Sequence, residues 1–491
     1  MRESADVMVI EHFDVLVVGA GLSGIGAGYH LQANCPTKSY AILEGRDSIG
    51  GTWDLFRYPG VRSDSDMYTL GYSFRPWKEA KSIADGPSIL DYVRDTAKAH
   101  GIDKKIRYGH RVTRASWSTR DAKWTLDVER GATRERVQLT TNFIYLCSGY
   151  YSYVEGFTPV FPGADRFAGR IVHPQKWTDD IDYAGKRVVI IGSGATAVTL
   201  VPAMAKSAAH VTMLQRSPTY VVALPDEDPI ANFLRRHLPS KPAYAITRWK
   251  NVALGMAFFE LSRRAPKLVK KLSRMGVRRA LGADYDIDTH FTPRYNPWDQ
   301  RVCLVPNGDF FEAIKAGRAS VVTDHIESFT EKGIKLRSGV ELDADLVVTA
   351  TGLDLVAFGG MQLSVDGRDV DLAKTLSYKG MMCSGVPNLA SAIGYTNASW
   401  TLKCDLTSEY ICRLLNHMEK HGYRVCTPHN SDPSIVELPL LDFSSGYVKR
   451  AIHKFPKQGS KAPWKLRQNY VLDLLMLRYG EIEDGAMEFS R

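Results

Sequence analysis

Two glycine-rich stretches have the spacing with which protein backbones bind dinucleotide phosphates. The first follows an apolar run at 15–18, and the second follows another at 188–191. Glycines there allow a tight turn and a close approach to a pyrophosphate, while the N-terminus of the next helix offers free amides. The residues expected at the phosphates are Gly19, Gly21, Ser23 and Gly24 in the first loop and Gly192, Ser193, Gly194, Ala195 and Thr196 in the second.

The end of the next strand distinguishes the two units. In the first unit it carries Glu44, and a carboxylate at that place accepts hydrogen bonds from ribose hydroxyls. In the second unit it carries Arg216, with Ser217 beside it. A guanidinium binds the 2′-phosphate of NADP, which a carboxylate would repel. The first unit therefore predicts FAD or NAD, and the second predicts NADP.

Each loop must be held between a strand and a helix, and the order of these elements predicts the domain plan. Two further apolar strands, 143–152 and 341–354, end in small residues and are expected to return the chain to the first unit, with Ala350, Thr351 and Gly352 close to a cofactor. The prediction is an α/β fold with two Rossmann-like dinucleotide-binding domains. Its parts are an FAD-binding domain of 1–155 and 337–491, an NADP-binding domain of 156–224 and 291–336, and a helical insertion of 225–290 that covers the NADP-binding domain.

Composition excludes several other classes of protein. With 44% hydrophobic and 24% charged residues, the chain is neither disordered nor fibrous. Its seven cysteines are scattered and form no Cys-x-x-Cys pair, which argues against a disulfide framework, a metal site and a dithiol redox centre. No stretch reaches the roughly 18 uninterrupted apolar residues that a membrane span needs. We expect a cytoplasmic protein without a metal.

The net charge of +9 comes from one segment. Residues 231–280 contain 13 Lys or Arg and a single acid, Glu260, whereas the rest of the chain is slightly acidic. A solvated helical face explains this pattern most simply. Peripheral contact with anionic lipid stays open, because apolar and aromatic residues alternate with the bases. No nucleic-acid partner is expected, since no binding motif accompanies the charge.

Two longer motifs resemble those of a known family. Residues 51–64 match the pattern GxWxxxxYPGxxxD, and residues 167–177 match the fingerprint FxGxxxHxxxW. Both are similar to the Baeyer–Villiger monooxygenases, a family of class B flavoprotein monooxygenases. Strings such as TMLQRSPTY, SYKGMMCSG and GYTNASWTLK resemble its ethionamide-activating subgroup. The residues that carry the motifs are Gly51, Thr52, Trp53 and Asp64, and Phe167, Gly169, His173 and Trp177.

The resemblance implies FAD and NADPH as cofactors and O₂ with a small ketone or sulfide as substrates. In the family, NADPH reduces the flavin, O₂ adds to it as a C4a-peroxide, and the peroxide converts a ketone to an ester or lactone or a sulfide to a sulfoxide. The family's catalytic arginine corresponds to Arg301, and Asp64 would position it. Gly51, Thr52, Trp53 and Asp64 would contact the cofactor. Relatives often carry a lysine before the arginine, where this chain has Gln300.

Alternative roles stay open for several of these residues. Arg301 could be a structural ion pair, and Asp64 could cap a helix, because Ser63-Asp64-Ser65-Asp66 is a good capping string. His173 and Trp177 are expected to couple the two domains and not to act as a base or a substrate contact. A flavin S- or N-oxygenase without ketone activity is the alternative function. The sequence leaves the physiological substrate and the oligomeric state open.

Three predictions concern the C-terminal part of the chain. The segment 438–465 resembles a lid over the substrate, with Trp464 as its gate, because closing the site keeps water from a reactive intermediate. Asn397 and Trp400 are expected near the cofactors, with simple core packing as the alternative.

Overall fold

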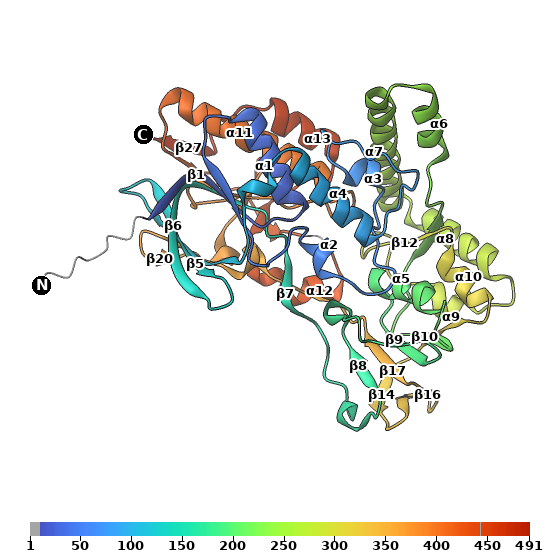
Figure 1. The fold of residues 1–491 in the computed structure, drawn as a ribbon. Coiled ribbons are helices and arrows are strands. Elements are labelled where there is room, and N and C mark those ends of the chain that lie inside the picture. Colours follow the sequence, from blue (N-terminus) through green and yellow to red (C-terminus); the bar gives the residue numbers. More distant parts are fainter. Residues whose placement is uncertain (1–9, 442) are drawn as a thin grey trace, which may run out of the picture.

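The computed structural model describes residues 10–441 and 443–491, and two sheets organise it. In the first sheet, the apolar strand β1 (Glu11–Val18) lies between β2 (Tyr40–Leu43) and β6 (Glu135–Leu146), parallel to both. Helix α1 (Leu22–Asn34) connects β1 to β2, as the first βαβ unit predicts. Figure 1 shows this sheet on the left, with α1 above it.

Further strands extend the first sheet on both sides: β4 and β5 continue it antiparallel beyond β6, whereas β3 pairs in parallel with β2, β19 with β4 and β23 with β6. Its order is β20-β19-β4-β5-β6-β1-β2-β3, and β23 pairs with β6 as well. Buried side chains alternate with partly exposed ones along β5, which fits a strand that covers a core on one face. The added strands are β3 (Ile106–Arg107), β4 (His110–Ser118), β5 (Lys123–Arg130), β19 (Gln362–Val365), β20 (Arg368–Asp369), β21 (Ser377–Tyr378), β22 (Met382–Cys383) and β23 (Leu389–Ser391).

The second sheet has five parallel strands in the order β13-β10-β9-β17-β8, at the lower right of Figure 1. Helix α5 (Ala195–Met204) follows β9 and completes the second βαβ unit. Helix α10 (Asp309–Lys315) packs beside α5. The strands are β8 (Arg170–Val172), β9 (Arg187–Ile191), β10 (His210–Gln215), β13 (Ala319–Thr323) and β17 (Leu346–Thr349).

The prediction that 341–354 returns the chain to the first domain, with a boundary at 337, is wrong for most of that segment. Strand β17 pairs with β8 and β9 inside the second sheet. All four of its side chains are buried, which suits a parallel sheet covered on both faces. The chain leaves this sheet only after β17, where β18 (Leu353–Leu355) pairs with β7 (Tyr151–Gly156).

The segment 225–290 is helical, as predicted, but it does not cover the second sheet alone. Helix α7 (Ser240–Arg264) packs against α3 (Met67–Leu70) of the first unit, whereas α8 (Pro266–Leu281) packs against α10 of the second. Helices α6 (Pro229–His237) and α9 (Ile287–Phe291) complete the insertion. Helices α6 and α7 project at the upper right of Figure 1.

A buried arginine attaches α7 to the first unit. Arg248 is 8% exposed and donates hydrogen bonds to the carbonyl oxygens of Tyr68 and Gly71, each at 2.8 Å. Its guanidinium also lies 3.8 Å from the carboxylate of Asp405 on α11 (Trp400–His421). A buried charge requires such partners, since an unpaired one is strongly unfavourable.

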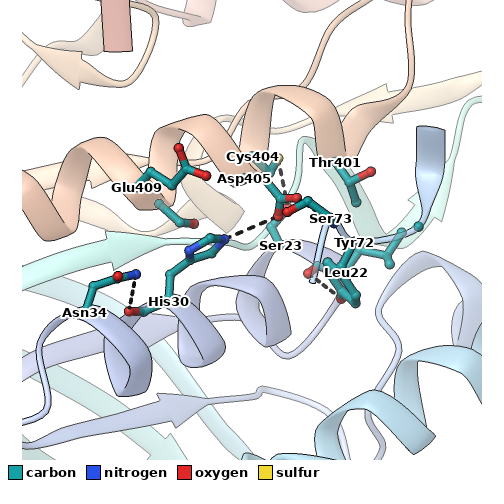
Figure 2. A network of polar contacts seen from close by, with 12 residues as sticks. Leu22, Ser23, His30, Asn34, Tyr72, Ser73, Thr401, Cys404, Asp405 and Glu409 are labelled. Carbon is teal, nitrogen blue, oxygen red and sulfur yellow. Dashed lines mark hydrogen bonds and ion pairs between the residues drawn. The ribbon is translucent and has the colours of Figure 1, made fainter. Parts of the chain in front are cut away.

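Asp405 joins this contact to the packing of α1 on α11. Figure 2 shows its carboxylate facing His30 of α1, at 3.5 Å, and the backbone amide of Ser73, at 3.1 Å. Burial alone would raise the pKa of Asp405, but His30, Arg248 and the Ser73 amide together lower it. The network therefore holds a charged carboxylate between α1, α7 and α11.

The remaining elements connect and cover these two units. No helix among the described residues is long and apolar enough to cross a membrane. The other helices and strands include α2 (Thr52–Leu55), α4 (Gly86–Ala99), α12 (Gly446–Ala451), α13 (Tyr470–Leu474), β11 (Val221–Leu224), β12 (Cys303–Pro306), β14 (Ile326–Phe329), β15 (Gly333–Leu336), β16 (Glu341–Asp343), β24 (Val425–Pro428), β25 (Glu437–Pro439), β26 (Lys457–Gly459) and β27 (Met487–Ser490).

Candidate functional site

A cavity of about 670 Å³ lies at the carboxyl end of β1, on the first glycine loop. Its wall combines backbone from the loop with side chains from β2, α2 and α11, which is the arrangement expected at the ligand edge of an open α/β sheet. The predicted residues that line it are Gly19, Gly21, Ser23, Glu44, Gly51, Thr52, Trp53 and Asp64.

The first loop needs glycine for steric reasons. Gly19 has φ +105°, and a Cβ there would lie 2.6 Å from the carbonyl oxygen of Cys147. A Cβ on Gly24 would lie 1.9 Å from the carbonyl oxygen of Gly19. Gly24 does not line the cavity; it lets α1 approach the loop closely enough to aim its N-terminus at the cavity.

Glu44 lies at the cavity wall and is 6% exposed. One carboxylate oxygen accepts a hydrogen bond from the Ala20 amide at 2.8 Å, and the other accepts one from the Arg46 amide at 3.0 Å. Burial raises the pKa of Glu44, and these two amide hydrogen bonds oppose the rise. Because a carboxylate can accept about four hydrogen bonds, capacity remains for ribose hydroxyls.

A second cavity, of about 800 Å³, lies on the second glycine loop. Gly192 has φ +137°, and a Cβ there would lie 2.3 Å from the carbonyl oxygen of Ala350. A Cβ on Gly194, by contrast, would meet no atom within 4 Å, so the backbone before α5 is open to a ligand. The predicted residues that line this cavity are Gly192, Ser193, Gly194, Ala195, Thr196, Arg216, Ser217, Ala350, Thr351 and Gly352.

Arg216 and Ser217 follow β10 at the wall of the second cavity, and both are exposed. The Ser193 hydroxyl donates to the Ser217 carbonyl at 3.1 Å, which ties the glycine loop to this segment. The exposed guanidinium and hydroxyl fit the 2′-phosphate of NADP, because that group carries charge and stays partly solvated. Gln300 lines the same cavity.

The two cavities meet at Arg301 and Asp64, which line both. Arg301 donates a hydrogen bond to the Asp64 carboxylate, although the two residues are far apart in sequence. Their side chains are 34% and 36% exposed. The negative charge of Asp64 raises the pKa of Arg301 well above its usual value, so the guanidinium stays charged. A fixed positive charge therefore lies between the two nucleotide loops.

The helix-cap alternative for Asp64 does not fit the structure. The N-cap of α3 is Asp66, whose carboxylate accepts a hydrogen bond from the Thr69 amide at 3.0 Å. The Asp64 carboxylate instead accepts from Arg301. The motif GxWxxxxYPGxxxD thus ends with a side chain directed at the place where the two cavities join.

Arg301 lies in a loop just before β12, and other segments hold this loop. The carbonyl oxygen of Asp299 accepts hydrogen bonds from the amide and the hydroxyl of Ser444, at 2.9 and 2.8 Å. The Asp299 carboxylate lies 3.2 Å from the guanidinium of Arg263 on α7. The helical insertion and the 438–465 segment thereby both contribute to the placement of Arg301.

Several residues at this junction were missed by sequence reasoning. Tyr151 lines both cavities, and Tyr447 and Arg450 of α12 line the second. Burial raises the pKa of Tyr151 and of Tyr447, so both hydroxyls stay protonated beside Arg301. No motif marks these positions; only the repeat of Tyr at 150 and 151 after a strand end could have drawn attention to one of them.

The fingerprint residues Phe167, Gly169, His173 and Trp177 line neither cavity. His173 accepts a hydrogen bond from the Gln175 amide at Nδ1, at 3.2 Å, so its Nε2 carries the proton and donates to the Gly352 carbonyl at 3.1 Å. Burial lowers the pKa of His173, which favours this neutral form. Phe167 packs on Phe329.

The other two fingerprint positions are also structural. A Cβ on Gly169 would lie 2.6 Å from the carbonyl oxygen of Asp345, so glycine permits a close contact between chain segments. The Trp177 ring packs edge-on against Tyr183, with ring centroids 6.1 Å apart. Neither residue lines either of the two cavities.

The C-terminal predictions have mixed outcomes. Trp400 lines the first cavity and donates from Nε1 to the Ser23 hydroxyl at 2.7 Å, whereas Asn397 binds the Gln468 carbonyl and lines no cavity. Trp464 is not a gate. It is 2% exposed and packs edge-on against Tyr378 in the core. Burial removes the large apolar surface of this ring from water, which stabilises the core.

Two family models and close relatives match this chain. Residues 17–83 match a model described as an NAD(P)-binding Rossmann-like domain, and residues 69–231 match one described as flavin-binding monooxygenase-like. The chain is 55% identical over 482 residues to the FAD-containing monooxygenase EthA of Mycolicibacterium smegmatis, with 98% of each chain covered. The chain belongs to the FAD-containing monooxygenases.

Solved structures confirm the fold of this monooxygenase. An oxidized steroid monooxygenase bound to NADP superposes with a TM-score of 0.77 over 97% of this chain and 99% of that one, at 22% identity. OTEMO in complex with FAD and NADP superposes with a TM-score of 0.73 over 97% and 99%, at 20% identity. The predicted α/β fold with two dinucleotide domains is confirmed, and so are the predicted cofactors, FAD and NADPH.

Proposed function

We propose that this monooxygenase inserts one oxygen atom of O₂ beside a ketone carbonyl to give an ester or lactone, and that it also oxidises sulfides to sulfoxides. The observation that carries the proposal is the Arg301–Asp64 pair at the junction of the two cavities. FAD in the first cavity would supply the reducing electrons for O₂, and NADPH in the second would replenish them.

Arg301 supplies electrostatic stabilisation in this proposal. Attack on a ketone develops negative charge at the reacting oxygen atoms, and a preorganised cation there lowers the barrier. A guanidinium suits this role because it cannot lose its proton at neutral pH. Asp64 binds one edge of the guanidinium and fixes its direction. Tyr151 and Tyr447 narrow the space around it and limit the entry of water.

The cofactors would be divided between the cavities by charge. Glu44 would accept hydrogen bonds from the ribose of FAD, and Arg216 with Ser217 would bind the 2′-phosphate of NADPH. Relatives with a lysine at the position of Gln300 would offer the phosphate one more cation than this chain does. His173, through its bond to the Gly352 carbonyl, would couple the two domains. The seven cysteines are all unpaired, which supports a reducing cytoplasm as the location.

An S- or N-oxygenase without ketone activity is the second candidate. Oxidation of a sulfide needs no stabilised anion, so it would not require the Arg301–Asp64 pair. The ester-forming function is favoured because this cation is held by a dedicated carboxylate where the cavities meet.

A substrate panel tests the proposal. Purified holoenzyme with NADPH and ¹⁸O₂ is offered linear, cyclic and aryl ketones and prochiral sulfides, and products are identified by mass spectrometry. We expect esters or lactones that carry one ¹⁸O atom. Sulfoxides without an ester from any ketone would establish the second candidate instead, and NADPH oxidation without substrate gives the uncoupled background.

A further inference from the structure

Helix α8 exposes three large apolar side chains on one face. Leu268, Leu272 and Met275 are 46%, 50% and 56% exposed. Their spacing of four and three residues places them in one stripe, because successive residues of a helix are 100° apart. Val269 and Val277 are buried and attach a different side of the helix to the protein.

Basic side chains border this stripe. Helix α8 contains Lys267, Lys270, Lys271, Arg274, Arg278 and Arg279 and no acid. Arg274 pairs with Asp288 at 2.5 Å. Lys267, Lys271 and Arg278 are exposed, lie along one edge of the stripe, and have no ion-pair partner within the described part of the chain. The face therefore combines apolar surface with uncompensated positive charge.

Helix α7 continues the same pattern. Ile246, Leu254 and Leu261 are exposed at spacings of eight and seven residues, which again places them on one face. Trp249 and Phe258 are exposed beside them. A single residue, Ala265, separates α7 from α8. The two helices thus follow each other along the chain, and each carries an exposed apolar stripe. Figure 1 shows both helices at the right of the molecule, away from the first sheet.

We propose that the exposed face of α8, extended by that of α7, binds the surface of an anionic phospholipid bilayer. Charge complementarity identifies this occupant: phosphate headgroups neutralise the bases, while the apolar side chains enter the headgroup–acyl boundary. Residues 231–280 carry 13 bases and one acid, so a cationic partner or an uncharged surface would leave the charge unmatched. Contact is peripheral, since no described helix can span a membrane.

Vesicle binding tests this proposal with the FAD-loaded enzyme. Flotation is measured with vesicles of phosphatidylcholine alone and of phosphatidylcholine mixed with phosphatidylglycerol. We expect binding to the mixed vesicles that weakens as salt rises, and little binding to neutral ones. Equal binding to both kinds of vesicle, or to neither, would overturn the proposal.

Charge reversal locates the surface. The triple variant Lys267→Glu, Lys271→Glu and Arg278→Glu should bind mixed vesicles about 100-fold more weakly, because each base near an anionic surface contributes several-fold to affinity. A matched control changes three exposed bases elsewhere, Lys104→Glu, Arg120→Glu and Arg136→Glu, with the same change in net charge. Equal loss in both variants would show that only net charge matters and would refute the assignment to α8.

Apolar substitutions exclude the other occupants. The variant Leu268→Ser, Leu272→Ser and Met275→Ser should keep its FAD content and NADPH oxidation but lose vesicle binding. If it instead converts an oligomer to a monomer in sedimentation velocity without vesicles, and vesicle binding is unchanged, the face is a contact between copies. Binding of short duplex DNA as strong as that of mixed vesicles would overturn the lipid assignment.

Discussion

The two glycine loops have the same backbone plan and opposite electrostatics. In the first, a buried carboxylate, Glu44, is held by two backbone amides at the cavity wall. In the second, an exposed guanidinium, Arg216, lies at the corresponding strand end. A buried carboxylate held in a fixed position can accept hydrogen bonds from neutral hydroxyls. An exposed guanidinium suits a charged phosphate that keeps part of its hydration. One residue at each strand end thus gives the two units opposite charge, and the proposed division of FAD and NADPH between them rests on this difference.

The loops also differ in how tightly they pack. At the third position of the motif the first loop has Gly24, where an added Cβ would lie 1.9 Å from the Gly19 carbonyl oxygen, whereas the second loop has the buried Ala197. Helix α1 therefore approaches its loop too closely to allow a side chain at this position, and α5 does not. Four predictions test this comparison, from the largest expected effect to the smallest.

Gly24→Ala should abolish a stable FAD-loaded protein. The added Cβ would meet the Gly19 carbonyl at 1.9 Å, and backbone cannot shift there without displacing the loop. We expect the free energy of unfolding to fall by about 3 kcal/mol or more, well beyond an ordinary core substitution. Flavin absorbance and urea unfolding measure the effect. Gly255→Ala, in open space on α7, is the matched control and should be stabilising by ~0.5–1 kcal/mol.

Arg301→Ala should keep bound FAD and NADPH oxidation but lower ester formation by about 10²–10³-fold, the usual cost of one missing oxyanion-stabilising donor. Product analysis by mass spectrometry, beside the rate of NADPH consumption, measures this separation. Asp64→Asn leaves the guanidinium without its charged partner and should give an intermediate loss. Ester formation at the normal rate in Arg301→Ala would remove this residue from catalysis.

Arg216→Ala should raise the KM for NADPH by roughly 10–100-fold, in line with ~1.5–3 kcal/mol for hydrogen bonds to a charged group. The KM for NADH, which lacks the 2′-phosphate, should change little. Steady-state kinetics with both coenzymes measure the difference. Glu44→Gln is the companion variant: it should weaken FAD retention without altering the ratio of the two KM values. An equal loss with both coenzymes in Arg216→Ala would contradict the phosphate role.

His173, which donates a hydrogen bond to the Gly352 carbonyl, should make stability depend modestly on pH. Burial lowers its pKa in the folded protein, so the unfolded chain binds a proton first as pH falls. Its contribution to stability is therefore complete above about pH 6.5, the pKa of an unperturbed histidine, and is lost as pH falls from there toward the lower folded pKa. Between pH 7.5 and 5.5, the melting temperature of the native chain should fall more steeply than that of His173→Gln. If the melting temperatures of the two proteins fall in parallel, His173 is not the source of the pH dependence.

Much of the site was predictable because its signals are local. Glycine spacing, an apolar strand and the residue at the next strand end all lie within one βαβ unit, and each reflects a steric or electrostatic need of the bound nucleotide. Motif resemblance added Arg301 and Asp64, which local patterns could not connect. The failures were of another kind: β17 joined the second sheet, Trp464 went into the core, and Asn397 lay away from both cavities.

The sequence by itself predicted two dinucleotide units, which the structure confirms, the charge that each presents, and, through the family resemblance, one arginine and one aspartate as candidates for the chemistry. Tertiary structure alone decided that Arg301 meets Asp64 across 237 positions of chain and that α7 reaches the first unit through Arg248. It also decided that Tyr151 and Tyr447 line the same cavity as Arg301. These contacts depend on how separate elements pack against each other. Hydrophobic periodicity reports local secondary structure, so it carries no signal for contacts between distant parts of the chain.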